Sequence, residues 1–369
     1  MYKNPTYFAF NITERCQSHC ITCNGWQTPY EKIQNELSAD DWKFILFKLK
    51  EWLGSFDFIF SGGEPFIRED IFEIADYAKK IGLTPKVITN GLGLQNKCEQ
   101  LIKSGFSDIT ISLNAVRNPV VHNRSRGRKD AFKITSDVIR NLVYLNRKYK
   151  SGKNILLSSV IMPSNLSELV PLAEFAKNNQ IGINFQLMDD GNSFFLAYNI
   201  AAECNKTFEE LKEETVRAID ELKILKQRGY LIYNTENQLD GFKDLIIKSE
   251  PSKNSSEIIP NIFGRENFNY SEAVRDNKIN QEYLNSKNTN TCSFNETDNS
   301  ADGCQIGYRN FILDPYGNVR ICFNFESIGS LTEDLPQNLW YGEKAFEIRN
   351  KISRCNKSCK LLNCNYCED

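Results

Sequence analysis

The chain has 369 residues, more than an average domain, so a large core domain with a smaller appended unit is expected. Its 45 basic and 47 acidic residues give a net charge of -2, which argues against a polyanion-binding surface and so against a nucleic-acid partner. The N-terminus lacks a secretory signal and no apolar run approaches the ~18 residues of a membrane span, so we expect a cytoplasmic protein without a membrane partner.

From residue 6 to about 188, short β-rich runs alternate with longer stretches of helical period, which predicts βα units around a parallel sheet. The predicted strands span residues 7–13, 56–60, 86–90, 107–113, 154–161 and 181–187. The predicted helices span residues 39–52, 68–81, 95–104, 130–149 and 165–178. Six repeats predict an α/β fold with an open, partial (β/α)6 barrel over residues 1–190.

Two further segments separate this barrel from the C-terminal region. A long amphipathic helix is predicted from Phe208 to a stop at Gly229. Residues 251–302 are rich in Asn and Ser and poor in aliphatic side chains, a composition typical of a surface insertion. We therefore expect a linker and insertion over residues 191–300 and a small α+β unit over residues 301–369.

The twelve cysteines are distributed unevenly. Because cytosolic thiols are kept reduced, clustered cysteines are better interpreted as metal ligands or catalytic thiols than as disulfides. One group lies near the start of the chain and a second crowds its end. Cys98, Cys204 and Cys292 stand apart, and for each a buried, small apolar side chain is the simpler interpretation.

The first group, Cys16, Cys20 and Cys23, directly follows the first predicted strand, so the thiols should converge at its carboxyl end, where parallel βα barrels form their active sites. Three thiolates can hold three irons of a cubane and leave the fourth iron open to a cofactor. A structural zinc site would need a fourth ligand. His19 is one candidate, although adjacent residues rarely reach the same metal.

In this spacing the chain resembles the radical S-adenosylmethionine (SAM) superfamily, whose C-x3-C-x2-C loop follows the first strand of a partial barrel. The resemblance implies a [4Fe–4S] cluster on the three cysteines and reductive cleavage of SAM to methionine and a 5′-deoxyadenosyl radical. It also implies an electron donor such as flavodoxin or ferredoxin. The sequence departs from the family at Thr22, where an aromatic residue usually precedes the third cysteine.

The same resemblance assigns the SAM-binding residues. The segment Gly62-Gly63-Glu64-Pro65 matches the family's element that contacts the methionine amino group, and the glycines allow a backbone to approach a ligand closely. Polar groups at the ends of the third and fourth strands would bind the ribose and the methionyl moiety: Thr89, Asn90, Ser112 and Asn114. Arg126 is preferred over Arg124 for the SAM carboxylate, and His122 is interpreted as a loop hydrogen-bonding residue.

The second cysteine group begins with Cys304 and Cys322, which bracket a predicted hairpin with its turn at Asp-Pro-Tyr-Gly. It ends with four cysteines within thirteen residues: Cys355, Cys359, Cys364 and Cys367. Spacing alone leaves zinc and iron–sulfur about equally favoured. The region resembles the SPASM and twitch extensions of radical SAM enzymes, which implies one auxiliary [4Fe–4S] cluster, or two if Cys292 contributes.

Relatives with such extensions most often modify peptides or proteins, so the resemblance implies oxidative modification of a peptide, such as a crosslink or dehydrogenation. Oxidation of a small molecule is a second possibility. A third is a peptide epimerase in which Cys204 acts catalytically by returning a hydrogen atom. From a different class, a non-enzymatic protein stabilised by zinc stays open.

Overall fold

The computed structural model describes residues 3–23, 25–28, 30–187, 206–248 and 304–355. Five of the cysteines discussed above lie outside these residues: Cys204, Cys292, Cys359, Cys364 and Cys367. Among the described helices, none combines the length and apolar character that crossing a bilayer requires.

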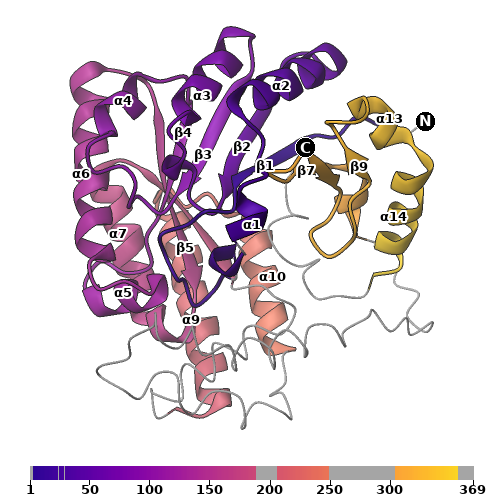
Figure 1. Cartoon of the computed structure of the whole chain (residues 1–369). Helices are drawn as coiled ribbons and strands as arrows, with labels where there is room; N and C mark the ends of the chain where they lie inside the picture. Colours follow the sequence, from indigo (N-terminus) through magenta and orange to yellow (C-terminus); the bar gives the residue numbers. More distant parts are fainter. Residues whose placement is uncertain (1–2, 24, 29, 188–205, 249–303, 356–369) are drawn as a thin grey trace.

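The centre of the molecule is one mixed sheet whose first six strands, in sequence order, are parallel neighbours (Figure 1). These strands are β1 (Tyr7–Thr13), β2 (Asp57–Gly62), β3 (Thr84–Thr89), β4 (Asp108–Ser112), β5 (Asn154–Ile161) and β6 (Gly182–Leu187). Because β6 pairs only with β5 among the named strands described, the barrel is open. The predicted partial (β/α)6 barrel is confirmed, and the bounds of β1 and β5 agree with the prediction.

Helices cover the outer face of this sheet (Figure 1). They are α2 (Ala39–Leu53), α3 (Ile71–Lys80), α4 (Cys98–Lys103), α6 (Ala131–Tyr149), α7 (Leu169–Asn179) and α9 (Phe208–Gln227). The short helix α5 (Pro119–Arg126) packs against α6 at the carboxyl ends of the strands, and α10 (Glu236–Ile247) packs against α9. The helix predicted from residue 165 begins only at Leu169, because Asn165 caps the Met162 N–H and donates to the Val160 carbonyl in a preceding 3-10 turn. The short helix α5 was not predicted.

The C-terminal region extends the same sheet. The predicted hairpin forms β7 (Asn310–Leu313) and β8 (Asn318–Arg320), followed by β9 (Gly329–Ser330), α13 (Pro336–Tyr341) and α14 (Glu343–Ser353). Strand β7 pairs in parallel with β1, so Tyr7 lies beside Asn310 and Phe10 beside Leu313. The hairpin therefore lies directly beside the strand that leads into the first cysteine group (Figure 1).

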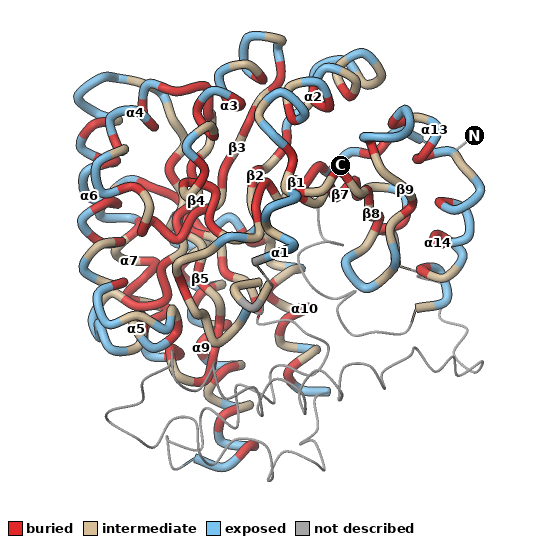
Figure 2. Tube along the Cα trace, in the orientation of Figure 1, coloured by how far each residue is buried: buried red, intermediate tan, exposed pale blue. Residues whose placement is uncertain are grey.

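The core lies between the outer face of the sheet and its helices, where Figure 2 shows buried segments on both layers. Phe10 of β1 packs against Phe58 of β2 with ring centroids 4.9 Å apart, and Phe58 lies 4.9 Å from Phe60. Side chains alternate along each strand, so these aromatic residues face the helices while their neighbours face the barrel interior. The interior positions are less buried, which leaves that face accessible to a ligand.

We predict that Phe60→Ala lowers the free energy of unfolding by about 3–5 kcal/mol, since it leaves a cavity between Trp42, Phe58 and Phe106. Urea titration of the cluster-free protein measures the change. The matched control is Phe44→Ala, because Phe44 is 61% exposed and its loss should cost less than about 1 kcal/mol. Equal losses for the two variants would contradict this account of the core.

Candidate functional site

A cavity of about 160 Å³ opens at the carboxyl ends of β1 to β4. The loop after β1 contributes the three thiols and β2 contributes two glycines, while β3, β4 and α5 contribute polar side chains. The lining residues are Cys16, Ser18, Cys20, Thr22, Cys23, Gly25, Trp26, Ser61, Gly62, Gly63, Ile88, Thr89, Asn90, Ser112 and Arg126. The structure thus brings most of the predicted cofactor-binding residues to one place.

The cysteine loop is hydrogen-bonded to the end of α5. The His19 N–H donates to the Arg126 carbonyl (3.1 Å) and the Ile21 N–H donates to the Ser125 carbonyl (3.2 Å). Gly127 follows with a φ of +62°, and a Cβ there would lie 2.4 Å from the His19 carbonyl oxygen. A left-handed glycine is therefore required for the two segments to lie this close.

Gly62, the last residue of β2, and Gly63, which follows it, make a close backbone contact that the sequence did not reveal. A Cβ on Gly62 would lie 2.4 Å from the Thr13 carbonyl oxygen, and one on Gly63 would lie 2.2 Å from that of Arg15. The Gly63 N–H donates to the Thr13 carbonyl (2.7 Å), and the Glu64 N–H donates to the Arg15 carbonyl (2.8 Å). The close approach that requires these glycines is thus between two protein backbones at the base of the cysteine loop.

Glu64 is fully buried, and its side chain is hydrogen-bonded to other residues of the protein. Its carboxylate accepts hydrogen bonds from the Thr89 hydroxyl (2.7 Å), the Asn90 N–H (2.7 Å) and the Phe66 N–H (3.2 Å). Burial raises the pKa of this carboxyl, and the three donors oppose that shift. Pro65 is also buried, in a 3-10 turn, and neither residue lines the cavity.

Burial favours the neutral form of the thiols while no cation is bound. Burial, with the neighbouring thiols adding to its effect, raises the pKa of Cys16 to about 11, and burial also raises the pKa of Cys23. A bound metal reverses this preference because its charge holds coordinating thiols in the deprotonated form. Amide donors are in place for the sulfurs, from Ser18 N–H to Cys16 (3.5 Å) and from Gly25 N–H to Cys23 (3.3 Å).

Two side chains complete the surroundings of the sulfurs. The amide of Asn90 lies 3.7 Å from Cys16 Sγ, and the guanidinium of Arg126 lies 3.7 Å from Cys20 Sγ. The described lining residues include no histidine or carboxylate that could act as a fourth ligand. In the described part of the chain, no three His, Cys, Asp or Glu side chains converge on a single-ion site. Three thiols without a fourth ligand among the described lining residues fit a cubane that leaves one iron open.

The polar residues at the strand ends have different positions. Ser112 lines the cavity, as do Thr89 and Asn90, whereas Asn114 does not. Asn114 is 1% exposed; its amide donates to Ser125 Oγ (2.9 Å), and its side-chain oxygen accepts from Val160 N–H (3.1 Å). Its polar atoms hold α5 to β5, and a direct contact of Asn114 with a cofactor stays a prediction.

Arg126 and Arg124, the two candidates for the SAM carboxylate, have different positions. Arg126 lines the cavity, whereas Arg124 is exposed. The Nε of Arg126 is buried and has no hydrogen-bond partner in the described part of the chain, which leaves a donor for a bound anion. His122 is buried and its Nδ1 accepts from the Asn114 N–H (3.1 Å), as expected for a loop hydrogen-bonding residue.

Sequence reasoning missed Trp26, Ser18 and Ser61. Trp26 lies at the cavity beside Cys23, where its indole N–H donates to the Cys23 carbonyl (2.8 Å). Its ring meets His19 edge to face with centroids 5.1 Å apart. An aromatic residue shortly after the third cysteine, beside the unusual Thr22, was the available signal. Ser18 and Ser61 gave none, because serine is common in loops and strand ends.

Three thiols of the C-terminal region also lie near one another. Burial raises the pKa of Cys322, and the neighbouring Cys304 and Cys355 add to this effect. The Asn324 N–H donates to Cys322 Sγ (3.4 Å). By contrast, Cys98 is 2% exposed inside the core, as predicted for an isolated cysteine.

Residues 10–176 match the sequence profile of the Radical SAM superfamily. Over 124 residues the chain is 34% identical to Fe-coproporphyrin III synthase of Methanosarcina barkeri, covering 33% of this chain and 30% of that protein. Over 178 residues it is 29% identical to AdoMet-dependent heme synthase of the same organism, covering 48% of each. The matches thus span less than half the length of these curated relatives.

Solved structures show the same fold. The chain aligns with SuiB of Streptococcus suis bound to the precursor peptide SuiA with a TM-score of 0.59 at 17% identity, covering 98% of this chain and 70% of that one. It aligns with anSMEcpe with bound AdoMet with a TM-score of 0.57 at 15% identity, covering 96% and 86%.

We predict that Gly63→Ala displaces the cysteine loop, because its Cβ would overlap the Arg15 carbonyl. After anaerobic reconstitution, the iron and sulfide content should fall by about one cluster. Gly105→Ala is the matched control, since its Cβ would lie 2.5 Å from the Ala75 carbonyl oxygen, remote from the loop. That variant should lose stability yet keep its iron. Retention of full iron and sulfide by Gly63→Ala would refute the prediction.

Proposed function

We propose that the protein cleaves SAM reductively with the region that matches the Radical SAM superfamily, residues 10–176, and oxidises a peptide or protein. The observation that carries the proposal is the arrangement of Cys16, Cys20 and Cys23 around one cavity without a fourth ligand among its described lining residues. Together, a reduced [4Fe–4S] cluster and SAM supply methionine and a 5′-deoxyadenosyl radical, which takes a hydrogen atom from the substrate.

In this proposal, the side chains and backbone of the protein bind and orient the cluster and SAM. The three thiolates hold the cluster, and the unpartnered Nε–H of Arg126 donates a hydrogen bond to the SAM carboxylate. The remaining SAM contacts come from Gly62, Gly63, Thr89, Asn90 and Ser112, which line the same cavity. Glu64 and Pro65 act indirectly by fixing the glycine backbone, and Asn114 acts indirectly by fixing α5.

The inner face of the barrel supports a neutral, polar substrate. Ser112, which lines the cavity, is in register with Ser158, and Ser158 is in register with Asn184. These three side chains are half-buried and make no hydrogen bond to another described residue, so they can donate to and accept from a substrate. Peptide groups match such hydroxyls and amides because they carry both donors and acceptors without net charge.

A tetrapyrrole is the second candidate substrate, favoured by the names of the two curated relatives. Several carboxylates make such a substrate anionic, and it would need cations in the barrel. On the inner face of the described strands β1 to β6 the one cation is Lys86, which is already paired with Asp57 (2.9 Å) and Asp108 (3.5 Å). The lack of an unpaired cation on this face favours the peptide, as does the fold shared with a protein bound to its precursor peptide.

The C-terminal cysteines are proposed to hold one or two auxiliary [4Fe–4S] clusters. Cys304, Cys322 and Cys355 lie near one another in the structure, and Cys359, Cys364 and Cys367 would complete the ligands. Removal of a hydrogen atom leaves a substrate radical, so a two-electron oxidation needs an acceptor for one further electron. An auxiliary cluster would be that acceptor, while flavodoxin or ferredoxin would supply the electron that cleaves SAM. The epimerase alternative, with Cys204, stays a prediction.

We predict that Cys20→Ala abolishes deoxyadenosine formation, because only two thiolates would remain for the first cluster. The assay is anaerobic incubation of reconstituted, reduced protein with SAM, followed by chromatography of the products. Cys98→Ala removes a thiol inside the core and should cleave SAM at the rate of the unaltered protein. Deoxyadenosine from Cys20→Ala at the normal rate, or none from the unaltered protein, would end the proposal.

The substrate class is tested with Fe-coproporphyrin III as the probe. Because the inner face of the described strands β1 to β6 offers its carboxylates no unpaired cation, and Arg126 is assigned to the SAM carboxylate, we expect an unchanged absorption spectrum on titration and no stimulation of deoxyadenosine formation. Short peptides encoded by neighbouring reading frames should instead stimulate deoxyadenosine formation and lose two hydrogen masses. Saturable binding and turnover of the tetrapyrrole would favour the second candidate.

A further inference from the structure

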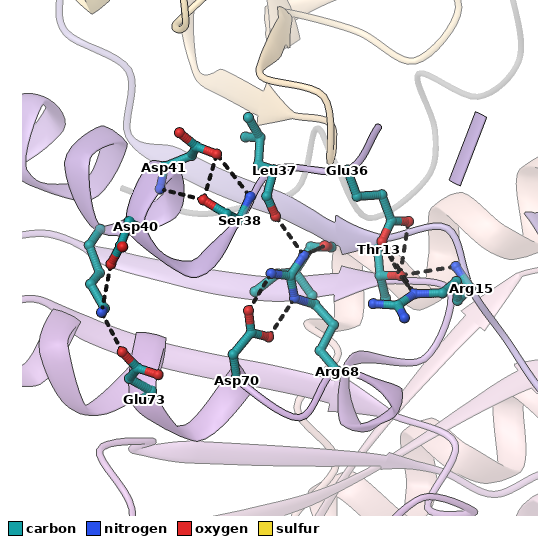
Figure 3. Close-up of polar contacts among 12 residues, drawn as sticks. Thr13, Arg15, Glu36, Leu37, Ser38, Asp40, Asp41, Arg68, Asp70 and Glu73 are labelled. Atoms are coloured by element: carbon teal, nitrogen blue, oxygen red, sulfur yellow. Dashed lines mark hydrogen bonds and ion pairs between the residues drawn. The ribbon is translucent and has the colours of Figure 1, made fainter. Parts of the chain in front are cut away.

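The segment that leads into Cys16 is held by a buried carboxylate. Glu36 accepts from the Thr13 hydroxyl (2.9 and 3.0 Å) and from the Glu14 N–H (2.6 Å), and it pairs with Arg15 (3.4 Å). Figure 3 shows Thr13 and Arg15 turned toward this carboxylate. The side chain of Glu36 is 5% exposed, so these contacts are largely shielded from water.

A buried cation fixes the neighbouring backbone. The Arg68 guanidinium donates to the carbonyls of Ile12 (3.2 Å) and Leu37 (3.0 Å) and pairs with Asp70 (2.7 Å) (Figure 3). The end of β1, the segment before α2 and the start of α3 are thereby joined at one point. The base of the cysteine loop cannot move without breaking several of these bonds.

The hairpin turn of the C-terminal region reaches the same place. The Tyr316 hydroxyl donates to Glu14 Oε2 (3.0 Å), and the Leu37 N–H donates to the Pro315 carbonyl (2.8 Å). Lys32 reinforces this contact, since its Nζ lies 3.2 Å from the Glu14 carboxylate and 4.7 Å from the centre of the Tyr316 ring. Burial and the hydrogen bond to Glu14 raise the pKa of Tyr316, so the phenol stays a donor.

The turn is rigid in itself. The Asp314 carboxylate accepts from the N–H groups of Tyr316 (3.0 Å) and Asn318 (2.9 Å), as in an Asx turn. Gly317 has a φ of +88°, and a Cβ there would lie 2.9 Å from Thr332. These contacts hold the turn in one conformation, so Tyr316 moves together with the hairpin.

We propose that Tyr316 is a positioning residue, which through Glu14 ties the hairpin carrying Cys322 to the loop carrying Cys16. One residue separates Glu14 from Cys16, and Cys322 lies two residues after β8. The extension would thus set the geometry of the first cysteine group as well as hold its own metal. The inference rests on the proposed function only for what the cysteine loop binds.

The test compares Tyr316→Phe, Glu14→Gln and the double variant with the unaltered protein. Each single change removes or weakens one hydrogen bond to a carboxylate, so we expect about a 3- to 10-fold higher KM for SAM and a smaller change in kcat. Glu14→Gln also weakens the ion pair with Lys32, so the double variant should resemble Glu14→Gln, which already weakens the contact that Tyr316→Phe removes. Tyr144→Phe, at a tyrosine 60% exposed on α6, is the matched control and should change nothing.

Two readouts do not depend on turnover. In metal-free protein, amide hydrogen exchange over residues 13–23 should be faster in Tyr316→Phe than in Tyr144→Phe. In reconstituted protein, the electron paramagnetic resonance spectrum of the reduced first cluster should change. Exchange and spectrum equal to those of the unaltered protein would overturn the inference, as would fully additive effects in the double variant. Failure of the unaltered protein to cleave SAM would refute the proposed function, while the exchange experiment would still test the tether.

Discussion

The site depends on the close contact of two backbone segments, Gly62-Gly63 and Thr13–Arg15. Carbonyl oxygens of the second segment occupy the space that a Cβ of the first would need. Two backbone hydrogen bonds between these segments, of 2.7 and 2.8 Å, replace those that the ends of β1 and β2 would otherwise make with water. This contact fixes where the cysteine loop starts. The positions of the thiols, of Asn90 and of Arg126 follow from it.

The two faces of the sheet differ in polarity: the outer face stabilises the fold, and the inner face is suited to binding. Aromatic side chains on the outer face bury their surface against the helices, and this burial supplies most of the stabilising free energy. The inner face carries Ser112, Ser158 and Asn184, whose side chains make no hydrogen bond to another described residue. A substrate or water must satisfy these groups, so the face that contributes least to the core is the face suited to binding.

The extension is part of the barrel's sheet. Because β7 pairs with β1, the hairpin that carries Cys322 and the loop that carries Cys16 are attached to adjacent strands. Glu14, Glu36 and Tyr316 join them on the side where both emerge. A continuous sheet with a hydrogen-bonded turn would hold the two proposed metal centres at a constant distance.

The sequence alone determined features that depend on residues close together in the chain. The strand periodicity predicted β1 and β5, and the spacing of Cys16, Cys20 and Cys23 placed three thiols on one loop. Tertiary structure decided what depends on register and on distant partners. Asn114 points toward Ser125 and not into the cavity, Gly62 and Gly63 serve Thr13 and Arg15, and Tyr316 meets Glu14 from 302 residues away. No local pattern encodes such contacts, because they arise only when β7 pairs with β1 and the parallel strands fix which side chains share an edge.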